Sequence, residues 1–226
     1  MSDLRFYAGQ STISRVASDT RLVGARSTRD GALFTAPWEL ALVMEGKVFG
    51  TQAGTVTTGI AGHATIDADQ PEFAIRAAAD TLVIIPLRLL ALAQSFETTL
   101  GIHELMWAAS NIDVANGTST ATAVAMNYNM SSSNAATAVT RHTYSANGTD
   151  PLTADNHIEL VRNAGVFDSD AATSGITGLQ ALWCARDNIA PVLARTGSIV
   201  GYGGGGTTAN FFFQAAWAEF TQAEIE

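Results

Sequence analysis

The side chains of this sequence that could take part in chemistry are few, and they lie far apart along the chain. The four histidines are His63, His103, His142 and His157, and none of them forms an H-x-H or H-E-x-x-H pair. A zinc site of the usual kind needs such clustered ligands, so a metal site here requires histidines from distant strands to converge. The spacing therefore predicts no catalytic residue, no cofactor and no enzymatic activity.

Two short acidic runs carry oxygen ligands at a spacing that suits Ca²⁺. Asp67 and Asp69 form the first run, and Asp168 and Asp170 form the second. Neither run has the glycine at the sixth position and the distal glutamate of an EF-hand loop. These four aspartates are therefore weak candidates for a calcium site. The prediction is that no metal binds, because turn aspartates usually bond to backbone N–H groups.

A glycine-rich segment contains a literal G-x-G-x-x-G match at Gly201, Gly203 and Gly206. Dinucleotide binding requires this turn to open a helix, but residues 211–213 (FFF) indicate a strand instead. The glycines are therefore expected in a flexible surface loop or a positive-φ turn. Cys184, the single cysteine, lies in an apolar run and is predicted to be a buried structural thiol.

The elements that must position these side chains alternate apolar and polar residues with a period of two, which indicates half-buried strands. Within residues 210–220, Phe211, Phe213, Ala215 and Trp217 share one face. Pro86 donates no ladder bond, so it belongs at a strand start, a bulge or an edge. The segments predicted as strands are residues 38–45, 83–93, 102–109, 120–126, 137–144, 158–161, 179–185, 198–202 and 210–220. About eight or nine strands with little helix predict an all-β, jelly-roll-like β-sandwich over residues 30–226.

The charge of the chain is low in density and uneven in distribution. Charged residues make up 15% of the sequence, and the formal net charge is −9. Such a composition suits a subunit whose flanks are covered by neighbours, because charge is depleted at interface centres. Residues 1–29 differ, since they carry a net charge of +3 and are predicted to form an N-terminal arm. The basic residues of this arm are Arg5, Arg15, Arg21, Arg26 and Arg29.

Three segments resemble those of small jelly-roll capsid proteins of tailless icosahedral viruses, especially bacteriophages. They are residues 80–90 (DTLVIIPLRLL), 199–208 (IVGYGGGGTT) and 209–220 (ANFFFQAAWAEF), about a seventh of the chain. The resemblance implies a shell-forming subunit with two four-stranded sheets, and several such viruses carry a membrane beneath the shell. The long, strongly basic arm of many RNA-binding capsid proteins is not present in this sequence.

The resulting hypothesis is a virion structural protein, assembled in the host cytoplasm, that forms an icosahedral shell through lateral apolar contacts. Its expected partners are copies of itself and other capsid proteins, with a viral membrane or the genome reached through the N-terminal arm, and no small-molecule substrate. One alternative is a receptor-binding or lectin-like β-sandwich such as a phage fibre or spike head. A second alternative is a cupin-like metalloenzyme, which would bring histidines together inside the barrel.

Overall fold

The computed structural model describes most of the chain that follows the predicted arm. The described residues are 37–95, 101–114, 118–146, 150–153, 155–167, 178–205 and 209–225. The predicted N-terminal arm, including its five arginines, lies outside them, as do Asp168, Asp170 and Gly206.

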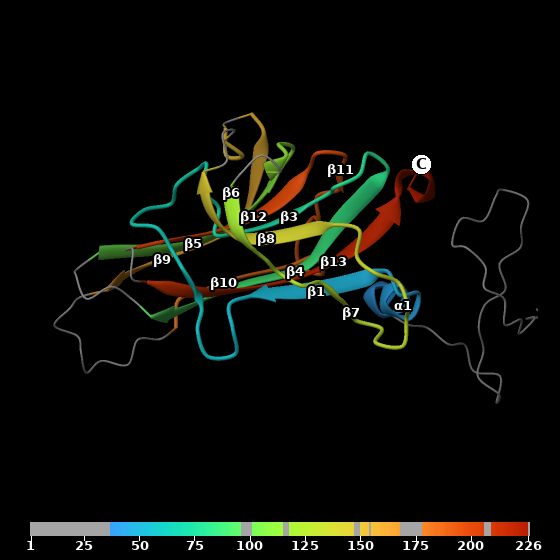
Figure 1. The fold of residues 1–226 in the computed structure, drawn as a ribbon, viewed down its shortest axis with the longest axis horizontal. Coiled ribbons are helices and arrows are strands. Elements are labelled where there is room, and N and C mark those ends of the chain that lie inside the picture. Colours follow the sequence, from blue (N-terminus) through green and yellow to red (C-terminus); the bar gives the residue numbers. More distant parts are fainter. Residues whose placement is uncertain are drawn as a thin grey trace, which may run out of the picture.

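The described chain folds into two antiparallel sheets that face one another (Figure 1). The seven-stranded sheet has the order β10-β4-β13-β1-β7, with β11 on β4 and β2 on β13, and the six-stranded sheet has the order β6-β8-β3-β12-β5-β9. The strands are β1 (Val48–Ala53), β2 (Ile60–Ala61), β3 (Phe73–Arg76), β4 (Leu82–Ser95), β5 (Gly101–Ser110), β6 (Thr118–Thr122), β7 (Met126–Asn127), β8 (Val139–Ala146), β9 (His157–Phe167), β10 (Gln180–Cys184), β11 (Leu193–Ala194), β12 (Ser198–Gly204) and β13 (Asn210–Thr221). The predicted all-β class is confirmed.

The strand pairing is that of a jelly roll, a long hairpin wrapped around a barrel. Leaving aside β2, β6, β7, β8 and β11, the first long strand pairs with the last (β1 with β13) and the second with the last but one (β3 with β12). The series continues inward with β4 on β10 and β5 on β9. The roll closes where β13 pairs with β4 and β12 with β5. The jelly-roll prediction is therefore confirmed at the level of topology.

The core between the sheets is built around stacked aromatic rings. Phe73 and Phe213 stack with their ring centroids 6.2 Å apart, and Trp107 meets both rings edge-on at 5.7 and 5.5 Å. Phe211 and Trp217 are also fully buried, so the predicted inward face of β13 is confirmed. Aromatic pairs in these orientations add to the free energy of burying their area, which makes this cluster the centre of the sandwich.

Pro86 lies at an irregularity of the β4–β13 ladder, one of the positions the sequence predicts. Trp217 is opposite Pro86 and Ala216 is opposite Arg88, so Leu87 is the extra residue of a β-bulge. The bulge exchanges the two faces of β4, because Ile84 before it and Leu89 after it both face the main core. A strand of constant alternation, as predicted for residues 83–93, would have turned one of these two segments away from the core.

The prediction of a strand over residues 38–45 is wrong, since this segment forms the helix α1 (Trp38–Met44). Pro37 precedes the first helical residue, and Gly46, with φ at +69°, follows the last turn. Proline before a helix and glycine after it are common boundary residues. Over seven residues a period of two and a period of 3.6 both place Leu42 on an apolar face, and the alanine, leucine, glutamate and methionine residues favour the helix.

The predicted strand over residues 120–126 is in fact divided between the two sheets. Its first part belongs to β6 in the six-stranded sheet, and Met126 begins β7 in the seven-stranded sheet. The chain crosses from one sheet to the other at residues 123–125, where Ala123 is buried. The small, alternating residues of this segment fit a strand but contain no signal for the crossing.

Candidate functional site

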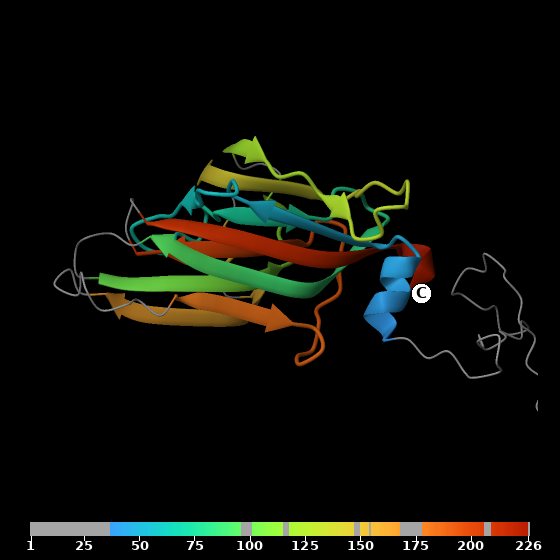
Figure 2. The same ribbon diagram turned by 90° about the horizontal axis from the view of Figure 1, so that it is seen from below.

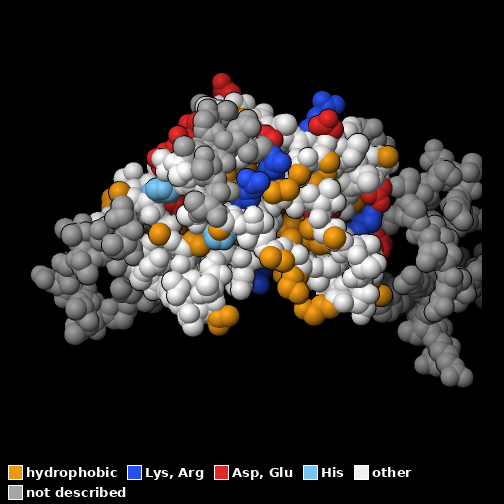
Figure 3. Space-filling view, in the orientation of Figure 1, with side chains coloured by type: hydrophobic (Ala, Val, Ile, Leu, Met, Phe, Trp, Pro, Cys, Tyr) orange, Lys and Arg blue, Asp and Glu red, His pale blue; other side chains and the backbone are white. Residues whose placement is uncertain are grey.

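Large apolar side chains lie exposed on two neighbouring parts of the molecule. The first, called the helix patch, comprises Trp38, Leu40 and Met44 on α1, each close to half exposed. The second, called the apolar strip, comprises Val124, Met126, Tyr128 and Met130, which are 56 to 84% exposed. Hydrophobic side chains gather below the middle of the space-filling view, where Figure 1 shows β4, β13 and β7 (Figure 3). Contiguous exposed apolar surface of this kind usually marks an interaction site.

Asparagine side chains hold the backbone of the apolar strip in place. Asn127 Nδ2 donates to the carbonyl of Gly46 at 2.8 Å, and Asn127 Oδ1 accepts from the amide of Asn129 at 2.8 Å. Asn129 Nδ2 donates to the carbonyl of Met44 at 3.2 Å, which joins the strip to the helix patch. Because the polar side chains bond inward to backbone groups, Met126, Tyr128 and Met130 are left on the outside. The strip is therefore an ordered surface built from the asparagine-rich part of the sequence.

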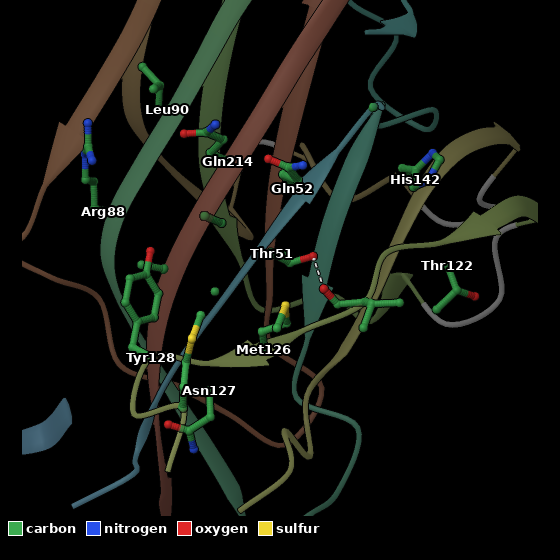
Figure 4. A pocket seen from close by; sticks show the side chains of 16 residues that line it. Thr51, Gln52, Arg88, Leu90, Thr122, Met126, Asn127, Tyr128, His142 and Gln214 are labelled. Atoms are coloured by element: carbon green, nitrogen blue, oxygen red, sulfur yellow. Dashed lines mark hydrogen bonds between the residues drawn. The ribbon is translucent and has the colours of Figure 1, made fainter. Parts of the chain in front are cut away.

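A groove of about 700 Å³ lies between the apolar strip and the outer face of the seven-stranded sheet. Strand register places six groove residues in two rows across β4, β13 and β1. The first row is Arg88, Ala216 and Gly50, and the second is Leu90, Gln214 and Gln52. The Tyr128 ring rests on Gly50, where an added Cβ would come within 2.4 Å of Tyr128 Cε2. Figure 4 shows Tyr128 and Arg88 on one side of the groove, with Gln214 and Gln52 side by side at one end.

Each of the four histidines lies among different neighbours, so the structure does not gather them at one site. His63 Nδ1 is 2.8 Å from Glu72 Oε1, and His157 Nδ1 is 2.9 Å from the carbonyl of Thr153. His103 is fully buried on β5, whereas His142 lines the groove. Burial lowers the pKa of His142, which favours its neutral form.

The contact between His63 and Glu72 anchors a loop to the six-stranded sheet. Glu72 is buried and also accepts a hydrogen bond from the amide of Gly203 at 2.7 Å. The hydrogen bond to Glu72 raises the pKa of His63, while burial raises the pKa of Glu72. Tyr202 donates to the carbonyl of Ala68 at 3.0 Å and holds the same loop from above. These groups hold the loop against the sheet. Apart from the short distance between His63 and Glu72 in the sequence, no sequence pattern predicts that they pair.

The calcium candidates Asp67 and Asp69 lie in this loop, where their carboxylates serve the local turn. Asp67 Oδ1 accepts from the amide of Asp69 at 3.4 Å, and Asp67 Oδ2 accepts from Gln70 Nε2 at 3.0 Å. A hydrogen bond with Asp67 raises the pKa of Asp69. Within the described part of the chain, no group of three or more histidine, cysteine or acidic residues is arranged to hold a metal ion.

The structure corrects the expected role of the glycine-rich segment. Gly201 and Gly203 lie buried inside β12 and not in a surface loop, and Gly205 has a positive φ of +134°. A Cβ on Gly201 would lie 2.9 Å from the Phe213 ring, and one on Gly203 would lie 2.5 Å from the Phe211 ring. The glycines are needed because the aromatic rings of β13 pack directly on the backbone of β12.

Cys184 is also placed differently from the prediction, because its side chain is only half-buried at the end of β10. It lies opposite Arg88 in the ladder with β4, and β10 forms one end of the seven-stranded sheet. The apolar neighbours Trp183 and Ala185 suggested a core position, but an edge strand covers its residues less completely.

No protein-family model matches the sequence, and no curated protein matches it at a significant level. Among the described residues, no helix is both long and apolar enough to span a membrane.

Proposed function

We propose that this protein is a virion structural protein, a capsid subunit that assembles with copies of itself and with other capsid proteins into an icosahedral shell. The observation that carries this proposal is the apolar strip, which the chain holds in an ordered conformation with its methionines outward. Holding the backbone of a contact segment in place in advance reduces the entropy lost on binding. An ordered, exposed apolar surface is therefore suited to a lasting protein contact.

The joining of the apolar strip to the helix patch supports the same proposal. The bond between Asn129 and the carbonyl of Met44 makes the two areas neighbours at one end of the sandwich. Methionine and aromatic residues are enriched at the buried centres of protein interfaces, where charged residues are depleted. The low charge content of the chain fits a subunit that is surrounded by others.

The jelly-roll topology supports the proposal more generally, because viral capsid domains are among the proteins that share it. Lectin domains and cupins share it as well, so the fold by itself does not select a function. In this proposal the N-terminal arm faces the interior of the virion, where its arginines contact the genome or a membrane.

Electron microscopy and sedimentation of the purified protein test the proposal. The wild-type chain is expected to form shells or capsomers with five- or six-fold symmetry. A variant carrying both Met126→Gln and Met130→Gln is expected to stay dispersed, because the changes place amides in the contact surface. Its free energy of unfolding should change by less than about 0.5 kcal/mol, since both side chains are exposed.

Val56→Gln is the matched control, because Val56 is 93% exposed but lies outside the apolar strip and the helix patch. This variant should assemble like the wild type. Wild-type protein that forms only a discrete trimer would favour the fibre-head alternative. Normal shells from the double methionine variant would show that the apolar strip is not the contact surface.

A further inference from the structure

The groove beside the apolar strip contains polar side chains that form no hydrogen bond or ion pair with other described residues. Arg88 forms no ion pair with any described residue, and its side chain lies exposed on the outer face of β4. Gln52 and Gln214 are opposite one another on β1 and β13, and neither side-chain amide has a hydrogen-bond partner among the described residues. Three such groups on adjacent strands provide donors and acceptors that only water or a ligand can satisfy.

The electrostatic character of the groove is opposite to that of the rest of the chain. Residues 30–226 contain nineteen acidic and seven basic residues, a net charge of −12. None of the described residues that line the groove is acidic, and Arg88 is the charged side chain among them. A guanidinium group binds carboxylates through two parallel hydrogen bonds. The groove thus favours a ligand that carries a negative charge.

The surface of the groove favours a flat ligand, and its amide side chains favour one with many hydroxyl groups. The Tyr128 ring lies over Gly50, so Ala216 forms the open part of the floor, and Arg88 lies opposite Ala216 on the adjacent strand, about 5 Å across the sheet. The Tyr128 ring, which is 56% exposed, presents an apolar surface beside this floor. Amide side chains can donate to hydroxyl groups and accept from them at the same time. A sugar ring needs this combination of a flat apolar support and two-way hydrogen bonding.

From these observations we propose that the groove is a binding site for an acidic saccharide. Arg88 bonds to the sugar carboxylate, Gln52 and Gln214 bond to hydroxyl groups, and Tyr128 packs beside the ring. A peptide strand is a less suitable ligand, because β7 already pairs with β1 at Phe49 and Gly50 and so occupies the adjacent sheet edge. The inference goes beyond the proposed capsid role. Because the apolar strip also lines the groove, a subunit contact over the strip would cover the site, so binding is measured on protein kept below the concentration at which it assembles.

Calorimetric titration of the purified chain tests this inference with four probes. These are a sialic acid-terminated trisaccharide, a galacturonic acid oligosaccharide, neutral lactose and a glutamate-rich peptide. At least one acidic saccharide is expected to bind saturably, more tightly than lactose or the peptide. Raising the salt concentration should weaken this binding, because a charged contact on an exposed face is screened.

Two groove variants and one control complete the design. Arg88→Gln should weaken binding of the acidic saccharide at least tenfold and bring it close to that of lactose. Ala216→Leu should remove binding by filling the floor, and unchanged circular dichroism and melting temperature will show that the sheet is intact. Arg186→Gln removes an exposed arginine elsewhere and should leave the affinity unchanged.

Three results would each overturn the inference. The first is the absence of saturable binding of either acidic saccharide to the wild type at millimolar concentration. The second is binding that Arg88→Gln and Ala216→Leu leave unaltered. The third is tighter, Arg88-dependent binding of the peptide, which would identify the groove as a protein contact. None of these results bears on whether the protein forms shells.

Discussion

The outer faces of the two sheets differ in how far the described chain covers them. The six-stranded sheet carries a second apolar cluster on its outer side, which the chain's own loops cover. Its buried members are Ala74, Met106, Ala108, Val114, Tyr144, Val200 and Tyr202, with Ile66 and Leu152 packed against them.

Among the described residues, the outer face of the seven-stranded sheet has a buried apolar cluster at one end. There Leu42 of α1 packs with Val48, Leu87 and Ala218, and Figure 2 shows α1 at the end of the sandwich. The remainder of this face holds the groove and is bordered by the apolar strip. Within the described residues, the chain therefore buries the apolar outer surface of one sheet and leaves apolar side chains exposed beside the other, which is the surface that the proposed contacts would use.

The largest expected effect comes from the core that supports both faces. Trp217→Asp places a carboxylate where Trp217 is fully buried, among the aromatic residues that face inward from β13. Loss of the ring and burial of a charge should cost more than about 4 kcal/mol and prevent folding and assembly. Circular dichroism of the expressed protein measures this, with Val56→Asp as the exposed control. A folded, assembled Trp217→Asp protein would contradict the packing of β13.

The next effect is confined to the covered face. Glu72→Ala removes the acceptor for His63 and leaves the amide of Gly203 buried without its bond. We expect a loss of about 2–3 kcal/mol, with faster hydrogen exchange in residues 62–72. Glu159→Ala, on the exposed part of β9, should cost less than about 0.5 kcal/mol. If saccharide binding in the groove also disappears in Glu72→Ala, the two faces are not independent.

A smaller effect is expected from Glu219, which is buried on the same side of β13 as Trp217 and whose carboxylate binds the chain that follows the apolar strip. Glu219 accepts from the amides of Thr137 and Ala138 and from Trp217 Nε1, at 2.8 to 3.1 Å. Glu219→Gln turns one acceptor into a donor and should cost about 1.5–2 kcal/mol. Hydrogen exchange at Thr137 and Ala138 and the assembly assay should both respond. Normal assembly with freely exchanging amides would show that the fastening does not matter for the contact.

The smallest effect is a pH dependence of the covered face. The folded-state pKa of His63 is raised by Glu72, so its stabilisation is complete below the unfolded pKa of about 6.5 and is lost as pH rises through the folded value. The raised pKa of buried Glu72 acts in the same direction from about pH 4.5 upward. The wild type should therefore lose more stability between pH 6 and pH 8 than His63→Gln does. Denaturant midpoints of both proteins at pH 6 and pH 8 measure this. An equal change in midpoint between the two pH values in wild type and His63→Gln would exclude His63 as the titrating group.

Part of the fold follows from the sequence by local reasoning. The alternation of Phe211, Phe213, Ala215 and Trp217 assigned the buried face of β13 correctly, because side chains in a strand alternate between faces whatever the strand pairs with. The missing N–H group of Pro86 predicts a strand start, a bulge or an edge, and the structure shows the bulge. Where a segment is short, as in α1, two periods fit the same residues, and the alternation predicts a strand where the structure has a helix.

The residues of the groove, in contrast, cannot be brought together by local reasoning from the sequence. Arg88, Gln214 and Gln52 come from three strands, and only the register of β4, β13 and β1 places them on one surface. The need for glycine at Gly201 and Gly203 likewise depends on which rings pack across from them.

The sequence by itself therefore determined the strand class and the inward face of the last strand, since both rest on residues one or two positions apart. Only the tertiary structure decided which face remained open and which polar groups meet there. The physical reason is that register is set by the packing of the whole roll, and a shift of one residue would turn each of these side chains to the opposite side.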